Sequence, residues 1–255
     1  MHGLIKQNTR KRQRIVNHQP ETITYNELIQ LPDLTIAEGS LSPMERSLLA
    51  HFIMLSRPQT IVELGVFEAH TSKFMCDVLK MNGLDATVYG FDLPHVISNL
   101  RDNNALVNQL EDEQQLSLVP GALPHSLIDW LKQHQQDIDF ALVDARHDYF
   151  SVMTELRLLY PRLKRGGFIL CHDYSDKYDS VYYAINRFAR ANGAMILPLA
   201  STADASEKGH HSVLVAVAKP IYPHHFTRNI YLAFQSRLIH SQFWQKYLRP
   251  ILRRS

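Results

Sequence analysis

The sequence is poor in cysteine and has no long apolar run. Its 255 residues include two cysteines, Cys76 and Cys171, which are too few for a disulfide framework and lack the paired spacing of a zinc finger. We expect both to pack as small apolar side chains. No apolar run reaches the roughly 18 to 20 residues of a membrane-spanning helix, and residues 1–16 lack the apolar core of a secretory signal. These absences favour a cytoplasmic protein.

Glycine is also scarce. The ten glycines never occur in the G-x-G-x-x-G spacing that is typical of dinucleotide-binding turns. In such a turn, small residues let the backbone approach a pyrophosphate closely. The absence of this spacing disfavours a nicotinamide (NAD)-dependent oxidoreductase, which stays open as an alternative function.

Acidic residues are missing from both ends of the chain. Residues 1–14 carry five Lys/Arg and residues 221–255 carry six, with no Asp or Glu in either segment. The remaining sixteen Lys/Arg stand against 25 Asp/Glu, so residues 15–220 have a net charge of −9. We therefore divide the chain into a basic N-terminal tail at 1–41, a folded domain at 42–220 and a basic helical extension at 221–255.

The basic ends suggest kinds of partner. Basic segments attract anionic lipid, nucleic acid or an acidic protein face. The N-terminal tail has no interleaved aromatic residues and no nucleic-acid motif, so we expect no nucleic-acid partner. In the extension, Phe243 and Trp244 stand near Arg249 and Arg253. This segment can pack in a homodimer, cover the active site or make peripheral contact with a membrane.

Between these ends, short apolar runs alternate with helical patterns. Ser42, Pro43 and Glu45 form a capping signal for a first helix, and a second helix is expected to open at His70-Thr71-Ser72. Further helical patterns lie at 127–135, 152–163 and 181–190. Runs rich in β-branched residues predict seven strands, at 60–66, 86–94, 116–122, 138–145, 166–174, 194–200 and 211–219.

This alternation predicts an α/β fold with a doubly wound, Rossmann-like sheet of seven strands. Strands separated by helices imply right-handed crossovers and parallel pairing. The link at 201–211 is too short and polar for a helical crossover. We therefore expect a mostly parallel sheet whose last strand is antiparallel.

Acidic or small residues follow the strands of this predicted sheet. Ligands bind beyond the carboxyl ends of parallel strands, and charge at the edge of a buried sheet is costly unless it is paired or bound. The strand ends carry, in chain order, Glu63 with Gly65, Asp92, Gly121 with Ala122, Asp144, and His172 with Asp173. Their shared placement predicts a binding site at this edge.

Four segments follow one another along the chain: "IVELGVFEAHTS", "VYGFDLP", "DFALVDARHDY" and "LKRGGFILCHDY". In order and spacing they resemble the motifs of class I S-adenosylmethionine-dependent methyltransferases. The nearest branch is that of small-molecule and sugar O-methyltransferases of macrocin-like and catechol-like type. The resemblance covers residues 43–219 and implies S-adenosylmethionine as cofactor and a hydroxyl of a small molecule or sugar as acceptor. It departs at Ala69, where many relatives have a second glycine.

The resemblance also implies a set of cofactor-binding residues. The acid and glycine after the first strand meet the methionine part, the acid after the second strand holds the ribose, and the loop after the third lies by the adenine. The whole expected set is Glu63, Gly65, Val66, Phe67, Thr71, Ser72, Asp92, Leu93, Gly121, Ala122 and Asp144.

Two mechanisms stay open for the activation of the acceptor. In the first, Asp144, His172 and Asp173 bind a divalent metal, Mg²⁺ or Mn²⁺, which lowers the pKa of the acceptor hydroxyl. A histidine ligand disfavours Mg²⁺, whereas Mn²⁺, Zn²⁺ or Fe²⁺ accept it. In the second, His147 is the catalytic base, oriented by Asp144 or Asp173. A module that binds the cofactor without catalysis is the remaining alternative.

Overall fold

A seven-stranded mixed sheet forms the centre of the computed structural model, which describes residues 32, 41–175, 179–199 and 214–220. The strands are β1 (Thr60–Leu64), β2 (Thr87–Asp92), β3 (Leu116–Pro120), β4 (Ile138–Val143), β5 (Leu163–Cys171), β6 (Met195–Pro198) and β7 (Val215–Ala218). The helices are α2 (Pro43–Ser56), α3 (His70–Met81), α4 (Pro94–Asn103), α5 (Ala105–Asp112), α6 (His125–Gln133), α7 (Tyr149–Arg162) and α8 (Asp179–Asn192).

The sheet order is β3-β2-β1-β4-β5-β7-β6. Strands β1 to β5 pair in parallel, and β7 is antiparallel to both β5 and β6. The predicted doubly wound sheet with a reversed last strand is therefore confirmed. The strand order changes direction between β1 and β4, where an open α/β sheet has its ligand crevice.

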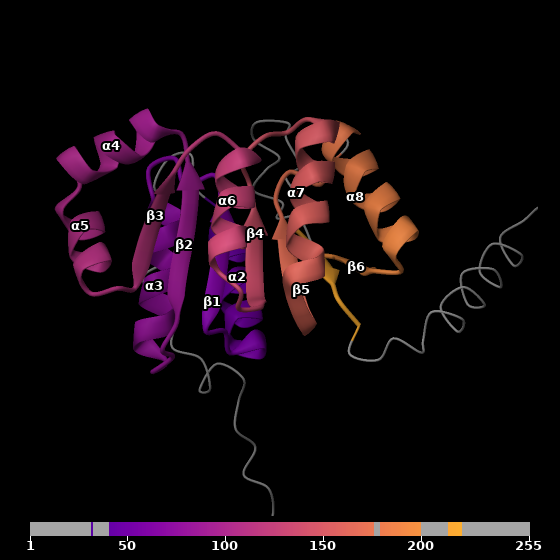
Figure 1. Ribbon diagram of the computed structural model, residues 1–255. Coiled ribbons are helices and arrows are strands. Elements are labelled where there is room, and N and C mark those ends of the chain that lie inside the picture. The colour runs from indigo at the N-terminus through magenta and orange to yellow at the C-terminus, as the bar shows by residue number, and fades with distance from the viewer. Residues whose placement is uncertain (1–31, 33–40, 176–178, 200–213, 221–255) are drawn as a thin grey trace, which may run out of the picture.

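Helices cover both faces of the sheet. In Figure 1, α6 and α7 lie in front of the sheet, α2 and α3 lie behind it, and the carboxyl ends of the parallel strands point upward. One apolar cluster packs α2 and α3 against the sheet, and a second packs α6, α7 and α8 against the other face. The sheet is buried on both faces, which is why its central strands read as continuous apolar runs.

The first helix begins as its capping signal predicts. The Ser42 hydroxyl accepts a hydrogen bond from the Glu45 amide at 3.3 Å, and Glu45 Oε2 accepts one from the Ser42 amide at 2.9 Å. Pro43 occupies the first helical position, where its missing N–H costs nothing. This reciprocal arrangement fixes the residue at which α2 starts.

Other boundaries differ from the expected ones. The fifth strand, predicted at 166–174, starts at Leu163 and ends at Cys171, because an irregularity in its pairing with β4 admits the residues before Gly166. Helices α4 and α5 fill the stretch between β2 and β3, where the sequence pattern predicts no helix. Both helices are short and bury few apolar side chains, so the helical pattern in their sequence is weak. The buried side chains are those of Ile97, Leu100, Val107 and Leu110.

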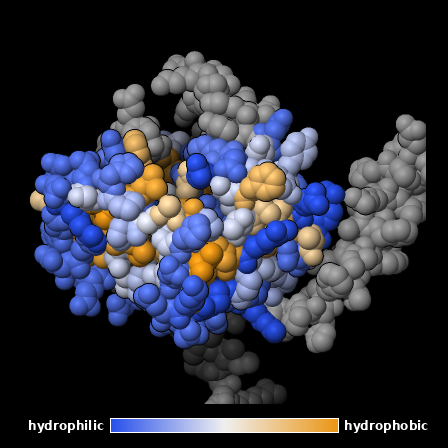
Figure 2. Space-filling model, turned by 45° about the horizontal axis from the view of Figure 1, so that its top comes forward, coloured by the Kyte–Doolittle hydropathy of each residue, from blue (hydrophilic) through white to orange (hydrophobic). Residues whose placement is uncertain are grey.

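The expected basic tail, apart from Pro32 and Leu41, and the expected C-terminal extension lie outside the described residues. Within the described part, no helix is both long and apolar enough to cross a membrane. Figure 2 brings the carboxyl edge of the sheet toward the viewer. Apolar residues form small groups among hydrophilic ones there.

Candidate active site

Two adjoining cavities lie at the carboxyl ends of the central strands. The first, of about 230 Å³, is lined by Gly65, Phe91, Asp92, Leu93, Gly121, Ala122, Leu123, Ala145 and Arg146. The second, of about 350 Å³, is lined by Gly65, Val66, Phe67, Glu68, His70, Thr71, Asp92, Asp144, Ala145 and His147. They share Gly65, Asp92 and Ala145, so together they form one trough across the ends of β1, β2 and β4.

The trough passes over a turn that only glycine can make. Gly65 has φ +91°, and a Cβ there would lie 2.4 Å from the carbonyl oxygen of Asp144. The turn continues through Phe67 and Ala69 with φ 50° and 60°. Ala69 therefore adopts the left-handed conformation that glycine reaches without strain. This explains why a second glycine serves at that position in the resembling family.

Asp92 joins this turn to the end of β2. Its Oδ2 accepts hydrogen bonds from the amides of Val66 and Phe67, both at 2.9 Å, and its Oδ1 accepts one from Leu93 at 2.7 Å. A carboxylate offers about four acceptor sites, so Asp92 can hold the turn and still accept a bond from a ligand in the trough.

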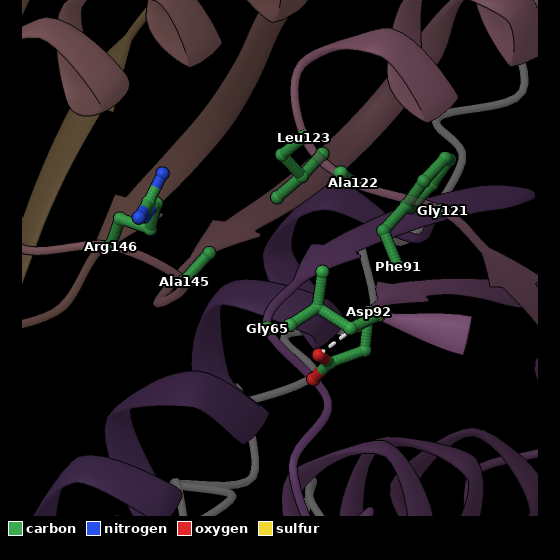
Figure 3. A pocket seen from close by; sticks show the side chains of 9 residues that line it. Gly65, Phe91, Asp92, Gly121, Ala122, Leu123, Ala145 and Arg146 are labelled. Carbon is green, nitrogen blue, oxygen red and sulfur yellow. Dashed lines mark hydrogen bonds between the residues drawn. The ribbon is translucent and has the colours of Figure 1, made fainter. Parts of the chain in front are cut away.

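Gly121 and Arg146 stand at the far end of the first cavity. The Gly121 amide donates to the carbonyl of Asp92 at 2.9 Å, which fixes the loop after β3 beside the end of β2. In Figure 3, Ala145 and Arg146 lie across the cavity from Ala122 and Leu123. Ala122, Leu123 and Ala145 line this end of the trough together with Arg146, which suits a flat heterocycle with polar edges.

Glu63 and Ser72 lie outside the lining of both cavities. Glu63 is 1% exposed and Ser72 is fully buried, and the Ser72 hydroxyl donates to Glu63 Oε2. Burial raises the pKa of Glu63 to about 8, and the charges of Asp144 and Asp92 add to the rise. Glu63 therefore holds a proton at neutral pH, and the pair supports the Gly65 turn from beneath.

Four side chains from two strand ends meet beside the second cavity, and we call them the Asp–His cluster: Asp144, His147, His172 and Asp173. His147 Nε2 lies 2.9 Å from Asp173 Oδ2 and 3.8 Å from Asp144 Oδ1. His172 Nδ1 lies 3.2 Å from Asp144 Oδ1 and 3.4 Å from Asp173 Oδ2. On its other side, His172 Nε2 lies 3.3 Å from Glu45 Oε1 of α2.

The carboxylates and imidazoles of the Asp–His cluster hold one another in their charged forms. Hydrogen bonds with Asp144 and Asp173 raise the pKa of His147 to about 10. Burial opposes the charge of His172, but the nearby carboxylates raise its pKa well above the ordinary value. Burial would raise the pKa values of Asp144 and Asp173, yet the two histidines lower both.

Three members of the cluster are suitably placed to hold a cation. Ligand atoms of Asp144, His147 and Asp173 all lie within 4.8 Å of one another. Neighbouring ligands of an octahedral cation lie about 3 Å apart when the bonds are about 2.1 Å. The sequence predicts His172 as the histidine ligand. The structure places His147 beside the same two carboxylates, while His172 connects them to Glu45.

The structure adds residues that we did not predict. The first cavity is also lined by Phe91, Leu123, Ala145 and Arg146, and Glu45 contacts the cluster. Ala145 and Arg146 directly follow Asp144, so extending the strand-end rule by two residues would have found them. Phe91 is a buried strand residue, and Glu45 shows only its capping role in the sequence.

Residues 62–174 match a family model described as "Methyltransferase domain". That segment includes the Gly65 turn, Asp92, the loop after β3 and the whole Asp–His cluster. This segment of the chain therefore carries a methyltransferase domain. With this match, the oxidoreductase alternative is set aside.

Solved structures share the fold of this methyltransferase domain. The O-methyltransferase from Bacillus cereus in complex with SAH is 16% identical, with a TM-score of 0.55 over 72% of this chain and 84% of that chain. TomG, an O-methyltransferase from Streptomyces achromogenes in complex with SAM, is 16% identical, with a TM-score of 0.50 over 74% and 83%. CalS11, a TDP-rhamnose 3'-O-methyltransferase, is 16% identical, with a TM-score of 0.54 over 67% and 77%.

At these identities, the likeness establishes the fold alone. A search of curated proteins gave no match to the sequence. The assignment of individual roles therefore depends on the geometry of the trough and of the Asp–His cluster.

Proposed function

We propose that the protein transfers a methyl group from S-adenosylmethionine to a hydroxyl of a small molecule or sugar. The observation that carries this proposal is the trough, which runs from Leu123 and Arg146 at one end to Asp144 and His147 of the Asp–His cluster at the other. A donor lying along it would present its methyl group beside Asp144 and His147. Two structural neighbours in complex with SAH and SAM, and a third that is a TDP-rhamnose 3'-O-methyltransferase, support the same proposal.

The chemistry of the trough fits this donor. S-adenosylmethionine carries an amino group, a ribose diol and a sulfonium cation, and it has no phosphate. Asp92 borders both cavities and retains capacity to accept a bond from the ribose, and Asp144 places negative charge where the sulfonium would lie. The missing Cβ of Gly65 leaves room for the ligand to approach the backbone.

The Asp–His cluster would activate the acceptor. Asp144, His147 and Asp173 would hold a divalent cation, which would supply a Lewis acid that lowers the pKa of the acceptor hydroxyl. In the ion-paired cluster, His147 carries a proton at neutral pH, so it cannot accept another. A metal would have to displace that proton, because histidine binds metal only as the neutral imidazole, and the convergence of three ligand atoms within 4.8 Å of one another favours the metal-assisted route. His172 and Glu45 would keep the two carboxylates oriented.

Titration calorimetry with S-adenosylmethionine and with SAH, each with and without Mn²⁺ or Mg²⁺, tests the donor. We expect micromolar binding of both ligands. A transfer assay with labelled donor then follows, using a panel of catechols, sugars and sugar nucleotides. Failure to bind either ligand would refute the proposed function, and binding without transfer to any acceptor would favour a non-catalytic module.

Removal of divalent metal is expected to lower turnover about 100-fold or more, because the acceptor hydroxyl would lose its Lewis acid. The assay compares protein treated with excess chelator with the same protein after Mn²⁺, Mg²⁺ or Zn²⁺ is restored. Because His147 offers an imidazole nitrogen as ligand, we expect Mn²⁺ to restore more activity than Mg²⁺. Full turnover in excess chelator would disprove the metal-assisted route and return His147 to the role of base.

Replacing Asp92 by alanine is expected to weaken SAH binding about 10- to 100-fold, because the ribose loses a charge-assisted acceptor and the turn loses its tie. Titration calorimetry measures the change. Asp102→Ala is the matched control, since the carboxylate of Asp102 on α4 accepts a hydrogen bond from the Ser98 hydroxyl. Unchanged affinity in Asp92→Ala would remove Asp92 from the site.

A further inference from the structure

Helices α7 and α8 lie side by side (Figure 1), and an open groove of about 580 Å³ runs along them. Its volume is within the range of pockets that bind small molecules. The lining, which we call the α7–α8 groove, consists of Tyr149 on α7 and of Tyr183, Asn186, Arg187, Arg190 and Ala191 on α8. None of these residues lines the trough, so the groove is a separate space.

Both charged residues of the α7–α8 groove are arginines. Arg187 and Arg190 are exposed and stand one turn apart on α8. Neither side chain has a hydrogen bond or an ion pair with another residue in the described part of the chain. The amide of Asn186 already donates to the Tyr174 hydroxyl at 2.9 Å and to the Tyr182 carbonyl at 2.8 Å. The groove therefore offers two available guanidinium groups, although the domain as a whole is acidic.

This lining suits a ligand that carries both a ring and a phosphate. A guanidinium group binds phosphate oxygens through a fork of N–H donors, and its charge does not depend on pH in the ordinary range. The side chain of Tyr183 is 61% exposed, and an exposed aromatic ring offers a flat apolar face against which a ligand ring can pack. The volume of the groove exceeds what a phosphate alone would fill.

The α7–α8 groove begins close to the Asp–His cluster. Tyr149 follows His147 by two residues, and Val181, in the first turn of α8, lines a small cavity together with three members of the cluster. From Val181 the helix rises about 9 Å to Arg187, at about 1.5 Å per residue, and Tyr183 lies between them. A ring beside Tyr183 would thus have the cluster on one side and the arginines on the other.

We infer that the α7–α8 groove holds a phosphate group of the methyl acceptor, which is therefore a phosphate ester or a diphosphate-linked compound. The inference rests on the proposed function and narrows its acceptor class. Arg187 and Arg190 bind the phosphate oxygens, and Tyr149 and Tyr183 pack against the ring of the acceptor. The reacting hydroxyl on that ring then faces the Asp–His cluster.

Titration calorimetry of the full chain with inorganic pyrophosphate and with inorganic phosphate tests the groove directly. The buffer is freed of divalent metal with a chelating resin, so that neither anion can bind through a cation at the Asp–His cluster. We expect saturable binding of one anion per chain. Pyrophosphate binding about 10-fold tighter than phosphate would identify a diphosphate-linked acceptor, and equal binding would identify a phosphate monoester.

Arg187→Gln and Arg190→Gln are each expected to weaken pyrophosphate binding about 10-fold, because each variant loses a hydrogen bond to a charged group. Arg157→Gln is the matched control. Arg157 is exposed on α7 and does not line the groove, so this variant loses the same charge and should bind pyrophosphate as the unmodified protein does. All three side chains are exposed, so we expect the substitutions to leave the fold intact.

The transfer assay then tests whether the bound anion belongs to the acceptor. It compares a free hexose with its 1-phosphate and with its nucleoside diphosphate derivative. We expect a phosphorylated form to have the higher kcat/KM by about 10-fold or more. Arg187→Gln should raise the KM for that acceptor about 10-fold and leave the affinity for SAH unchanged, because Arg187 does not line the trough. Pyrophosphate should compete with the acceptor and not with the donor.

Three results would overturn the inference: no binding of either anion to the unmodified protein, undiminished pyrophosphate affinity in both groove variants, or equal transfer to the free and phosphorylated hexoses. The first needs no variant. If the protein still binds SAH, each of these results leaves the proposed function intact. If it binds neither S-adenosylmethionine nor SAH, the proposed function fails and takes the acceptor assignment with it, whatever the pyrophosphate titration shows.

Discussion

Replacing Asp144 by alanine is expected to lower the turnover number for methyl transfer about 1,000-fold, within the range that positioned acid–base groups supply. Asp144 Oδ1 lies 3.2 Å from His172 Nδ1 and 3.8 Å from His147 Nε2. The carboxylate therefore orients both imidazoles and offers an oxygen to a cation. Its loss leaves His172 between Asp173 and Glu45 alone, and His147 with one carboxylate.

The measurement is a steady-state assay that separates turnover number from KM, together with the affinity for SAH. Asp148→Asn is the matched control. Asp148 stands in the same segment and caps α7 through the amides of Phe150 and Ser151, a role that asparagine also fills. We expect this control to stay within about twofold of the unmodified protein. If Asp144→Ala keeps a third or more of the turnover, the cluster is not the catalytic centre.

Replacing Glu63 by glutamine is expected to stabilise the protein by about 3 kcal/mol at pH 7. The folded-state pKa of about 8 lies above the ordinary value of 4.5. The stability that this proton contributes is complete below pH 4.5 and is lost as the pH rises to 8, at about 1.4 kcal/mol per pH unit. Glutamine does not ionise and keeps the shape of the protonated acid, so the variant escapes this loss.

Denaturant unfolding of both proteins at pH 5 and pH 7 measures the difference. The gap in the free energy of unfolding between variant and unmodified protein should widen by about 2.7 kcal/mol between the two pH values. The stabilisation that the protonated forms of His147 and His172 contribute to the protein is also lost as the pH rises through their raised pKa values. The variant and the unmodified protein share that loss. A gap that does not change with pH would mean that Glu63 is ionised in the folded protein.

The parallel sheet made most of the site predictable. Once the strands are recognised, the rule that ligands bind beyond their carboxyl ends brings Gly65, Asp92, Gly121 and Asp144 to one edge, and the structure places all four in the trough. The start of α2 was also predictable, because Ser42 and Glu45 have the spacing at which each side chain caps the backbone amide of the other.

Side-chain direction was not predictable in the same way. His147 and His172 both follow strands, and chain spacing does not tell which one points toward the trough and which one points back toward α2. Glu155 presents a similar difficulty. A single acid on an amphipathic helix usually faces solvent, and only the packing of α7 against β4, β5 and α8 shows that this one is buried.

The carboxylate of Glu45 makes contacts with two different parts of the domain. One carboxylate oxygen closes the first turn of α2 on Ser42, and the other faces His172. The start of α2 is therefore coupled to the electrostatics of the Asp–His cluster by a single side chain. A substitution at either position removes a charge that faces the other, so we expect positions 45 and 172 to change together in evolution.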